Sequence, residues 1–138
     1  MPSYIPKSKN QEHITPDKIY NMICEISQIH KEQLYDPVPA GTPYKAPCFF
    51  NGLYGNWQEW NYLNPPYEVK TLTKFVDKAI EQASHGFKTW LLLPAKTDQD
   101  WFHMIIQRGY EIHWIRNRLR FKNNKWRATQ SHFLVLIK

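Results

Sequence analysis

The first periodic pattern along the chain predicts a helix that buries one face. Its apolar members recur at spacings of three and four: Ile19, Met22, Ile23 and Ile26. Because 3.6 residues make one helical turn, these side chains share a face. Thr15 is a candidate N-cap before this pattern, and Pro16 suits the first helical position. Residues 1–13 are mostly polar, so we expect a flexible arm there and a single folded domain over residues 14–138.

The same spacing predicts two more helices. One covers residues 71–84, where apolar side chains fall on one face. Another is expected to begin at a cap formed by Thr97 or Asp98, with Trp101 and Phe102 in the core. His103, beside them, is expected to bond within the domain rather than to act in catalysis.

Short apolar runs predict the strands. Residues 88–94 form a continuous run, which is typical of a strand buried on both faces. Other strands are expected at Gln33–Tyr35, Cys48–Phe50, Asn61–Leu63, 111–115 and 131–138, and a hairpin over 116–128 turning at Asn123 and Asn124. Alternating strands and helices indicate an α/β fold with a mostly parallel sheet, covered on both sides. We also expect the C-terminal strand to be antiparallel.

Two consecutive prolines follow the strand expected at Asn61–Leu63, in the sequence Asn64-Pro65-Pro66-Tyr67. One proline is enough for a turn, whereas two fix both backbones and bias Asn64 toward an extended conformation. We interpret the segment as a stiff platform that presents the Asn64 side chain, a backbone carbonyl and an aromatic ring. The alternative is a rigid strand-to-helix turn with a half-buried tyrosine.

A second candidate motif, Asp36-Pro37, follows the first expected strand. Ligands of an open parallel sheet bind beyond the carboxyl ends of its strands, so both motifs occupy candidate positions. They would lie together only if their two strands are neighbours, which the sequence leaves open. By itself Asp36 is better interpreted as a helix cap or a turn residue.

Taken in order, these motifs resemble the phage-type DNA adenine methyltransferase family. Asn64-Pro65-Pro66-Tyr67 has the form (D/N/S)-P-P-(Y/F) of amino-methyltransferases. The matching positions cover most of residues 14–137: Thr15-Pro16, Asp36-Pro37, Trp57, Asn64–Tyr67, Leu92–Ala95, Thr97-Asp98, Trp101–His103 and Arg116–Phe121. The resemblance implies a compact Rossmann-like methyltransferase fold and transfer of a methyl group from S-adenosylmethionine to the exocyclic amine of adenine in DNA.

The resemblance also implies roles for single residues. Asn64 and the carbonyl of Pro65 would accept the two N–H bonds of the amine, Pro66 would help to fix this geometry, and Tyr67 would stack on the flipped base. The residues expected to bind the cofactor are Thr15, Pro16, Asp36, Pro37 and Asn64. No metal is expected.

The acidic motif departs from the family pattern. Asp36 is followed by "PVPAG", with Gly41 as its only glycine, and Glu59 is the only acidic residue over 37–60. Two alternatives therefore stay open. One is a catalytically weak or inactive DNA-binding relative, and the other is an amino-methyltransferase acting on RNA or on a protein glutamine.

The moderate excess of positive charge permits a polyanionic partner without establishing one. The chain has 18 Lys and Arg against 12 Asp and Glu, a net charge of +6. Six basic residues and no acidic one fall between residues 116 and 127: Arg116, Arg118, Arg120, Lys122, Lys125 and Arg127. We expect these side chains to contact DNA phosphates; the alternative is an edge strand guarded by charge.

Other features of the sequence bear on the state of the cysteines, the cellular location and the partners of the protein. Cys24 and Cys48 form no metal pattern and are expected to be free thiols. The sequence contains no apolar stretch of membrane-spanning length and no signal peptide, so we expect a cytoplasmic protein, in the host cell if it is viral, with no membrane partner. Few residues lie outside the core elements, so recognition of a DNA sequence should be short or weak, or supplied by a second subunit, as in a homodimer.

Overall fold

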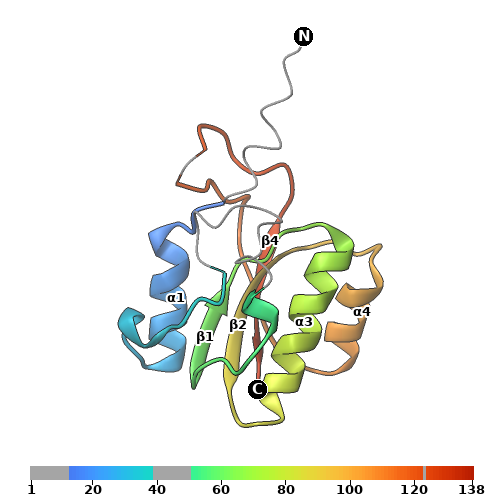
Figure 1. Ribbon diagram of the computed structural model, residues 1–138. Helices are drawn as coiled ribbons and strands as arrows, with labels where there is room; N and C mark the ends of the chain where they lie inside the picture. The colour runs from blue at the N-terminus through green and yellow to red at the C-terminus, as the bar shows by residue number, and fades with distance from the viewer. Residues whose placement is uncertain (1–12, 39–50, 123) are drawn as a thin grey trace.

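The structure is a computed structural model that describes residues 13–38, 51–122 and 124–138. A four-stranded sheet lies between α1 on one face and α3 and α4 on the other (Figure 1). Its helices are α1 (Asp17–Ser27), α3 (Val69–Ala83) and α4 (Asp100–Gln107), with short 3-10 turns η2 (Lys31–Gln33) and η3 (Asn51–Leu53). Its strands are β1 (Trp60–Leu63), β2 (Lys88–Pro94), β3 (Glu111–Trp114) and β4 (His132–Ile137).

The sheet is mixed, with the order β1-β2-β4-β3. β1 and β2 are parallel, whereas β4 is antiparallel to both β2 and β3. The predicted α/β class and the antiparallel C-terminal strand are confirmed. The prediction of a mostly parallel sheet is wrong, because β4 inserts between β2 and β3 and makes both of those pairings antiparallel.

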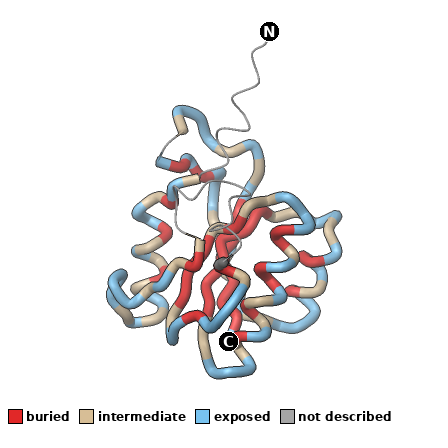
Figure 2. Tube along the Cα trace, in the orientation of Figure 1, coloured by how far each residue is buried: buried red, intermediate tan, exposed pale blue. Residues whose placement is uncertain are grey.

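The core has two layers, one on each face of the sheet (Figure 2). Leu91 and Leu93 of β2 pack toward α3 and α4, while Trp90 and Leu92 pack toward α1. This alternation follows from the two-residue period of a strand. The continuous apolar run of β2 is buried from Thr89 to Pro94, as predicted for a strand covered on both faces.

The helices form where the apolar spacing predicts them, but two caps differ. Pro16 occupies the N-cap position of α1, and no side-chain hydrogen bond caps that helix. The Thr15 hydroxyl lies 2.5 Å from the hydroxyl of Tyr62 instead. α4 begins at Asp100 with Gln99 at its N-cap, so neither Thr97 nor Asp98 has the predicted role.

The predictions for the first residues of α4 are confirmed. Trp101 and Phe102 are buried in the core, as predicted. His103 bonds within the domain, as predicted, because its Nε2 lies 2.6 Å from the carbonyl oxygen of Thr97.

Two predicted strand regions lack regular pairing. Residues 31–33 form η2, and only Tyr35 bridges to a strand. The expected hairpin is instead a loop without strands over residues 116–122 and 124–128. Leu119 and Phe121 are buried in the core layer that contains α1. The Ala128 N–H donates to the Leu119 carbonyl at 2.7 Å. The hairpin prediction is wrong because these two side chains anchor the segment in the core. The strand predicted at Cys48–Phe50 lies outside the described residues.

Candidate active site

The two candidate motifs follow the carboxyl ends of neighbouring strand segments, so they leave the sheet at the same end. Tyr35 forms a parallel bridge with Asn61; its N–H donates to the Trp60 carbonyl at 3.0 Å, and its carbonyl accepts from Tyr62 N–H at 2.9 Å. Asp36 follows this bridge directly, and Asn64 follows the end of β1. The segments that carry them are therefore neighbours, which is the adjacency that the sequence left open.

The Asn64 amide is held at both ends. Its Nδ2 donates to the carbonyl oxygen of His13 at 3.0 Å, and its Oδ1 accepts from the Tyr67 hydroxyl at 2.8 Å. Pro65 is buried and Pro66 half-buried between these two residues, before α3 begins. The two prolines thus form a stiff stretch of backbone between Asn64 and Tyr67, whose hydroxyl holds the Asn64 amide.

Tyr67 connects this amide to β4. His132, the first residue of that strand, places Nε2 3.0 Å from the Tyr67 hydroxyl. Burial raises the pKa of Tyr67, so its hydroxyl keeps its proton. Burial, and then the neighbouring His13, lower the pKa of His132 to about 4, and the Gln130 backbone offsets only part of this. His132 is therefore a neutral imidazole near pH 7.

Four rings from four segments close around this contact. His13 lies against Tyr67 and against Phe121, with centroid separations of 5.8 and 4.7 Å. His132 lies against the same two rings at 5.6 and 5.5 Å. The cluster joins four segments: the end of the expected arm, the motif after β1, the segment that carries Phe121, and the start of β4.

Asp36 lies in a less polar setting than a surface carboxylate. Its Oδ1 accepts from Val38 N–H at 2.9 Å, and burial raises its pKa to about 6. Burial raises the pKa values of Tyr20 and Tyr62, and the Asp36 charge adds a smaller effect in the same direction. Thr15 bonds the Tyr62 hydroxyl, so both of the predicted cofactor residues Thr15 and Asp36 lie near that tyrosine.

Trp57 is one of the positions that carry the family resemblance, and it supports the segment that contains the Asp36-Pro37 motif. Its indole N–H donates to the Gly52 carbonyl at 2.8 Å, and its ring is buried. A Cβ added to Gly52 would lie 2.7 Å from the Pro37 carbonyl oxygen, so only glycine allows this close approach. Trp57 therefore holds in place the turn that packs on Pro37.

The basic loop rises from the same end of the sheet (Figure 1). We call residues 115–122 and 124–131 the basic loop. Its six basic residues are exposed: Arg116, Arg118, Arg120, Lys122, Lys125 and Arg127. Lys122 pairs with Asp17 at 2.7 Å, and Arg127 donates to the Arg118 carbonyl at 3.1 Å. Trp126 is 75% exposed, with the Lys125 ammonium 5.4 Å from its ring centroid.

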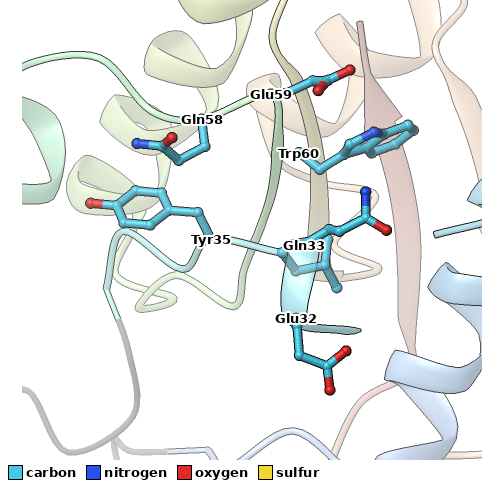
Figure 3. Close-up of a pocket in the computed structure, with 7 residues that line it drawn as sticks. Glu32, Gln33, Tyr35, Gln58, Glu59 and Trp60 are labelled. Atoms are coloured by element: carbon cyan, nitrogen blue, oxygen red, sulfur yellow. The ribbon is translucent and has the colours of Figure 1, made fainter. Parts of the chain in front are cut away.

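A separate acidic pocket lies at the opposite end of β1 (Figure 3). Its lining contains none of the predicted site residues: Glu32, Gln33, Leu34, Tyr35, Gln58, Glu59 and Trp60. It lies around Trp60, the first residue of β1, whereas Asn64 follows the last residue of that strand. This pocket is therefore distinct from the candidate site, which lies beyond the other end of β1.

Comparison with known proteins shows the family to which the chain belongs. A family model described as DNA N-6-adenine-methyltransferase (Dam) matches residues 3–134. The chain belongs to the Dam family. A DNA N-6-adenine-methyltransferase of Escherichia phage T1 is 44% identical over 54 residues, which cover 39% of this chain and 22% of that protein. No solved structure is significantly similar to the chain.

Membership of the Dam family confirms the resemblance that the ordered motifs predict. Within the described residues, no group of His, Cys, Asp and Glu side chains is arranged to hold a metal ion. No helix there is long and apolar enough to span a membrane. Cys24 is a free thiol, and Cys48 lies outside the described residues.

The sequence predictions missed two residues of the site, His13 and His132. His132 did offer a signal, because it begins an otherwise apolar run, and a buried imidazole needs a hydrogen-bond partner. His13 offered none, since its contribution to Asn64 is a backbone carbonyl.

Proposed function

We propose that this member of the Dam family transfers a methyl group to the exocyclic amine of adenine in DNA. The observation that carries the proposal is the Asn64 amide, held by the His13 carbonyl and the Tyr67 hydroxyl beside the Asp36 segment. An acceptor fixed before the substrate arrives needs no reorganisation during the reaction. We also propose that the sheet is a compact Rossmann-like methyltransferase sheet, extended beside β1 by the parallel bridge at Tyr35.

The proposed methyl donor is S-adenosylmethionine, which would supply an activated methyl group on a sulfonium. The residues fit a cationic ligand. Desolvation disfavours the Asp36 carboxylate, as its pKa of about 6 indicates, and the amino group of the donor would compensate for that loss. Thr15, Pro16 and Pro37 would complete the binding surface.

Asn64 and Pro65 would hold the amine of the target base. The Asn64 Oδ1 and the Pro65 carbonyl would each accept one N–H bond, which favours a nitrogen lone pair directed toward the methyl group. The base must leave the duplex stack to reach them. Stacking of Tyr67 on the flipped base is part of this proposal, and no general base is required to begin the transfer.

The basic loop is the proposed DNA surface. Ion pairs among the described residues engage Lys122 but not Arg116, Arg118 or Arg120, so these guanidinium groups remain free to meet phosphates. The exposed Trp126 ring adds a platform on which a base can stack. An arginine-rich strip with an exposed aromatic ring favours nucleic acid over a protein glutamine as substrate.

The decisive experiment is mass spectrometry of nucleosides from duplex DNA incubated with the protein and S-adenosylmethionine. We expect N6-methyladenine, and none with the Asn64→Ala variant. Parallel incubations with RNA and with a glutamine-containing protein test the alternative substrates. DNA binding without any methylated product would indicate the inactive DNA-binding relative.

A further inference from the structure

The hydrogen bonds around Tyr67 have only one consistent direction. A tyrosine hydroxyl carries one proton, and Asn64 Oδ1, 2.8 Å away, can only accept it. The contact between Tyr67 and His132 Nε2, at 3.0 Å, must then be donated by the imidazole. The order of donation is therefore His132 to Tyr67 to Asn64.

The surroundings of His132 agree with this direction. Its Nδ1 is buried and makes no well-aligned hydrogen bond within the described parts of the chain, although the Gln130 backbone is close enough to offset part of the lowered pKa of the ring. A proton on Nδ1 would meet at best a poorly aligned acceptor, whereas a proton on Nε2 has the Tyr67 oxygen at 3.0 Å, so the single proton of the neutral ring is better placed on Nε2. Contacts with Tyr67 and Phe121 fix the plane of the ring.

The same direction decides which amide atom of Asn64 serves the substrate. An amide can rotate and exchange its oxygen and nitrogen, but an amine substrate needs an acceptor. A donating Tyr67 hydroxyl requires Oδ1 on its side, and the His13 carbonyl requires Nδ2 on the other. Oδ1 has a second lone pair, which stays available to the adenine amine.

We propose that His132 is a positioning residue that makes the Tyr67 hydroxyl a donor and thereby fixes the orientation of the Asn64 amide for methyl transfer. The inference deepens the proposed function and rests on it. It gives Tyr67 a role through its hydroxyl, beyond any stacking of its ring. Misdirecting one acceptor by about an ångström can lower turnover on the order of 100-fold.

The first test uses Tyr67→Phe, which keeps the ring and removes only the hydroxyl. We expect kcat to fall about 10- to 100-fold, with KM for duplex DNA changed by less than about three-fold. His132→Phe should give a similar loss, and the double variant no more than Tyr67→Phe alone, because His132 acts only through that hydroxyl. Unchanged turnover in Tyr67→Phe, or losses that multiply in the double variant, would overturn the proposal.

Two further variants separate positioning from packing. His132→Gln restores an N–H near the position of Nε2 and should recover most of the lost kcat, whereas His132→Phe only fills space. His113→Phe is the matched control, since this histidine lies on β3 and contacts Glu111 rather than the site. Thermal unfolding of every variant checks that the fold is retained. Equal losses in His132→Gln and His132→Phe would contradict a donor role.

Nuclear magnetic resonance of the wild-type protein tests the inference without any turnover. The ring nitrogens of His132 should show the Nε2–H tautomer, and the Asn64 side-chain NH2 signal, assigned by its loss in Asn64→Ala, should shift alike in Tyr67→Phe and His132→Phe. An Nδ1–H tautomer would overturn the proposal. If DNA is not methylated but these signals behave as expected, the proposed function fails while the positioning network stands.

Discussion

At the scale of single residues, Asn64 has the most demanding proposed role. Its amide is half-buried and bonded at both ends, so its orientation is set before a base arrives. Such a preorganised acceptor acts where charge develops during the reaction. A side chain with this role should tolerate almost no change of chemistry.

Replacing Asn64 by Ala should abolish methyl transfer. Loss of one preorganised hydrogen-bonding group costs on the order of 100-fold or more in kcat. Affinity for S-adenosylmethionine, measured by calorimetry, should stay within a few-fold, because Asp36 is the proposed main contact for the donor. Turnover equal to that of the wild type would remove Asn64 from the mechanism.

Asp36 should make the protein less stable as pH rises. Its folded-state pKa is about 6 against an ordinary 3.8, so between these values the folded chain holds a proton that the unfolded chain releases. The free energy of unfolding should therefore fall from pH 4 to pH 6 and then level off. Asp36→Asn removes the charge and should be more stable above pH 6 by up to about 3 kcal/mol, with little change at pH 4.

The Asp36 carboxylate should strengthen binding of S-adenosylmethionine, although its charge lowers the stability of the fold. Asp36→Ala should weaken S-adenosylmethionine by about 1–3 kcal/mol, the scale of a hydrogen bond to a charged group. Chemical denaturation over a pH series, with calorimetry on the same samples, measures both effects. Equal donor affinity in the variant would mean that the acidic motif is misassigned.

At the scale of elements, the basic loop combines anchoring with exposure. Leu119 and Phe121 are buried, while Arg118 and Arg120 between and beside them are exposed. The basic side chains therefore alternate with buried apolar ones, even though no strand forms. The anchor also brings Phe121 against His13 and His132, so the loop and the candidate site share a core.

Replacing Arg118 and Arg120 together by Ala should weaken DNA binding alike for all sequences. Each phosphate contact contributes roughly 0.9 to the slope of log affinity against log salt, so the slope should fall by about two. Lys122→Ala should change it less, since that ammonium already pairs with Asp17. An unaltered slope in the double variant, with more light scattering, would instead support a loop that uses charge to prevent aggregation.

Trp126 allows a separate test of the same loop. If its exposed ring stacks on a base, Trp126→Ala should cost about 1–3 kcal/mol of DNA affinity with the salt slope retained. Tyr54→Ala is the matched control, because Tyr54 is 72% exposed but lies outside the loop. Fluorescence anisotropy with labelled duplex measures both, and equal effects would argue against stacking.

At the scale of the whole molecule, the sheet is stabilised by a layer of core on each face. α4 contributes Ile105, which is fully buried, next to Ile106, which is 40% exposed. Ile105→Ala should lower the free energy of unfolding by about 2–5 kcal/mol, and Ile106→Ala by much less. Urea unfolding of the two variants checks this, and similar losses would mean that the α4 layer is misassigned.

The sequence alone determined the three helices, the buried strand β2, the Asn64-Pro65-Pro66-Tyr67 motif and the family. All of these depend on patterns within short windows: the 3.6-residue period, a continuous apolar run, or residue types at fixed spacing. Helix caps were less predictable, since Thr15 bonds Tyr62, which is 47 residues away, instead of its own helix.

Only the tertiary structure decided how the site is put together. The Tyr35 bridge places the two motifs side by side, and β4 inserts between β2 and β3 to bring His132 to Tyr67. The contacts that hold Asn64 and Tyr67 join residues 51 and 65 positions apart. No local pattern encodes such pairs, because they form only after the sheet order and the packing of its faces have brought distant segments together.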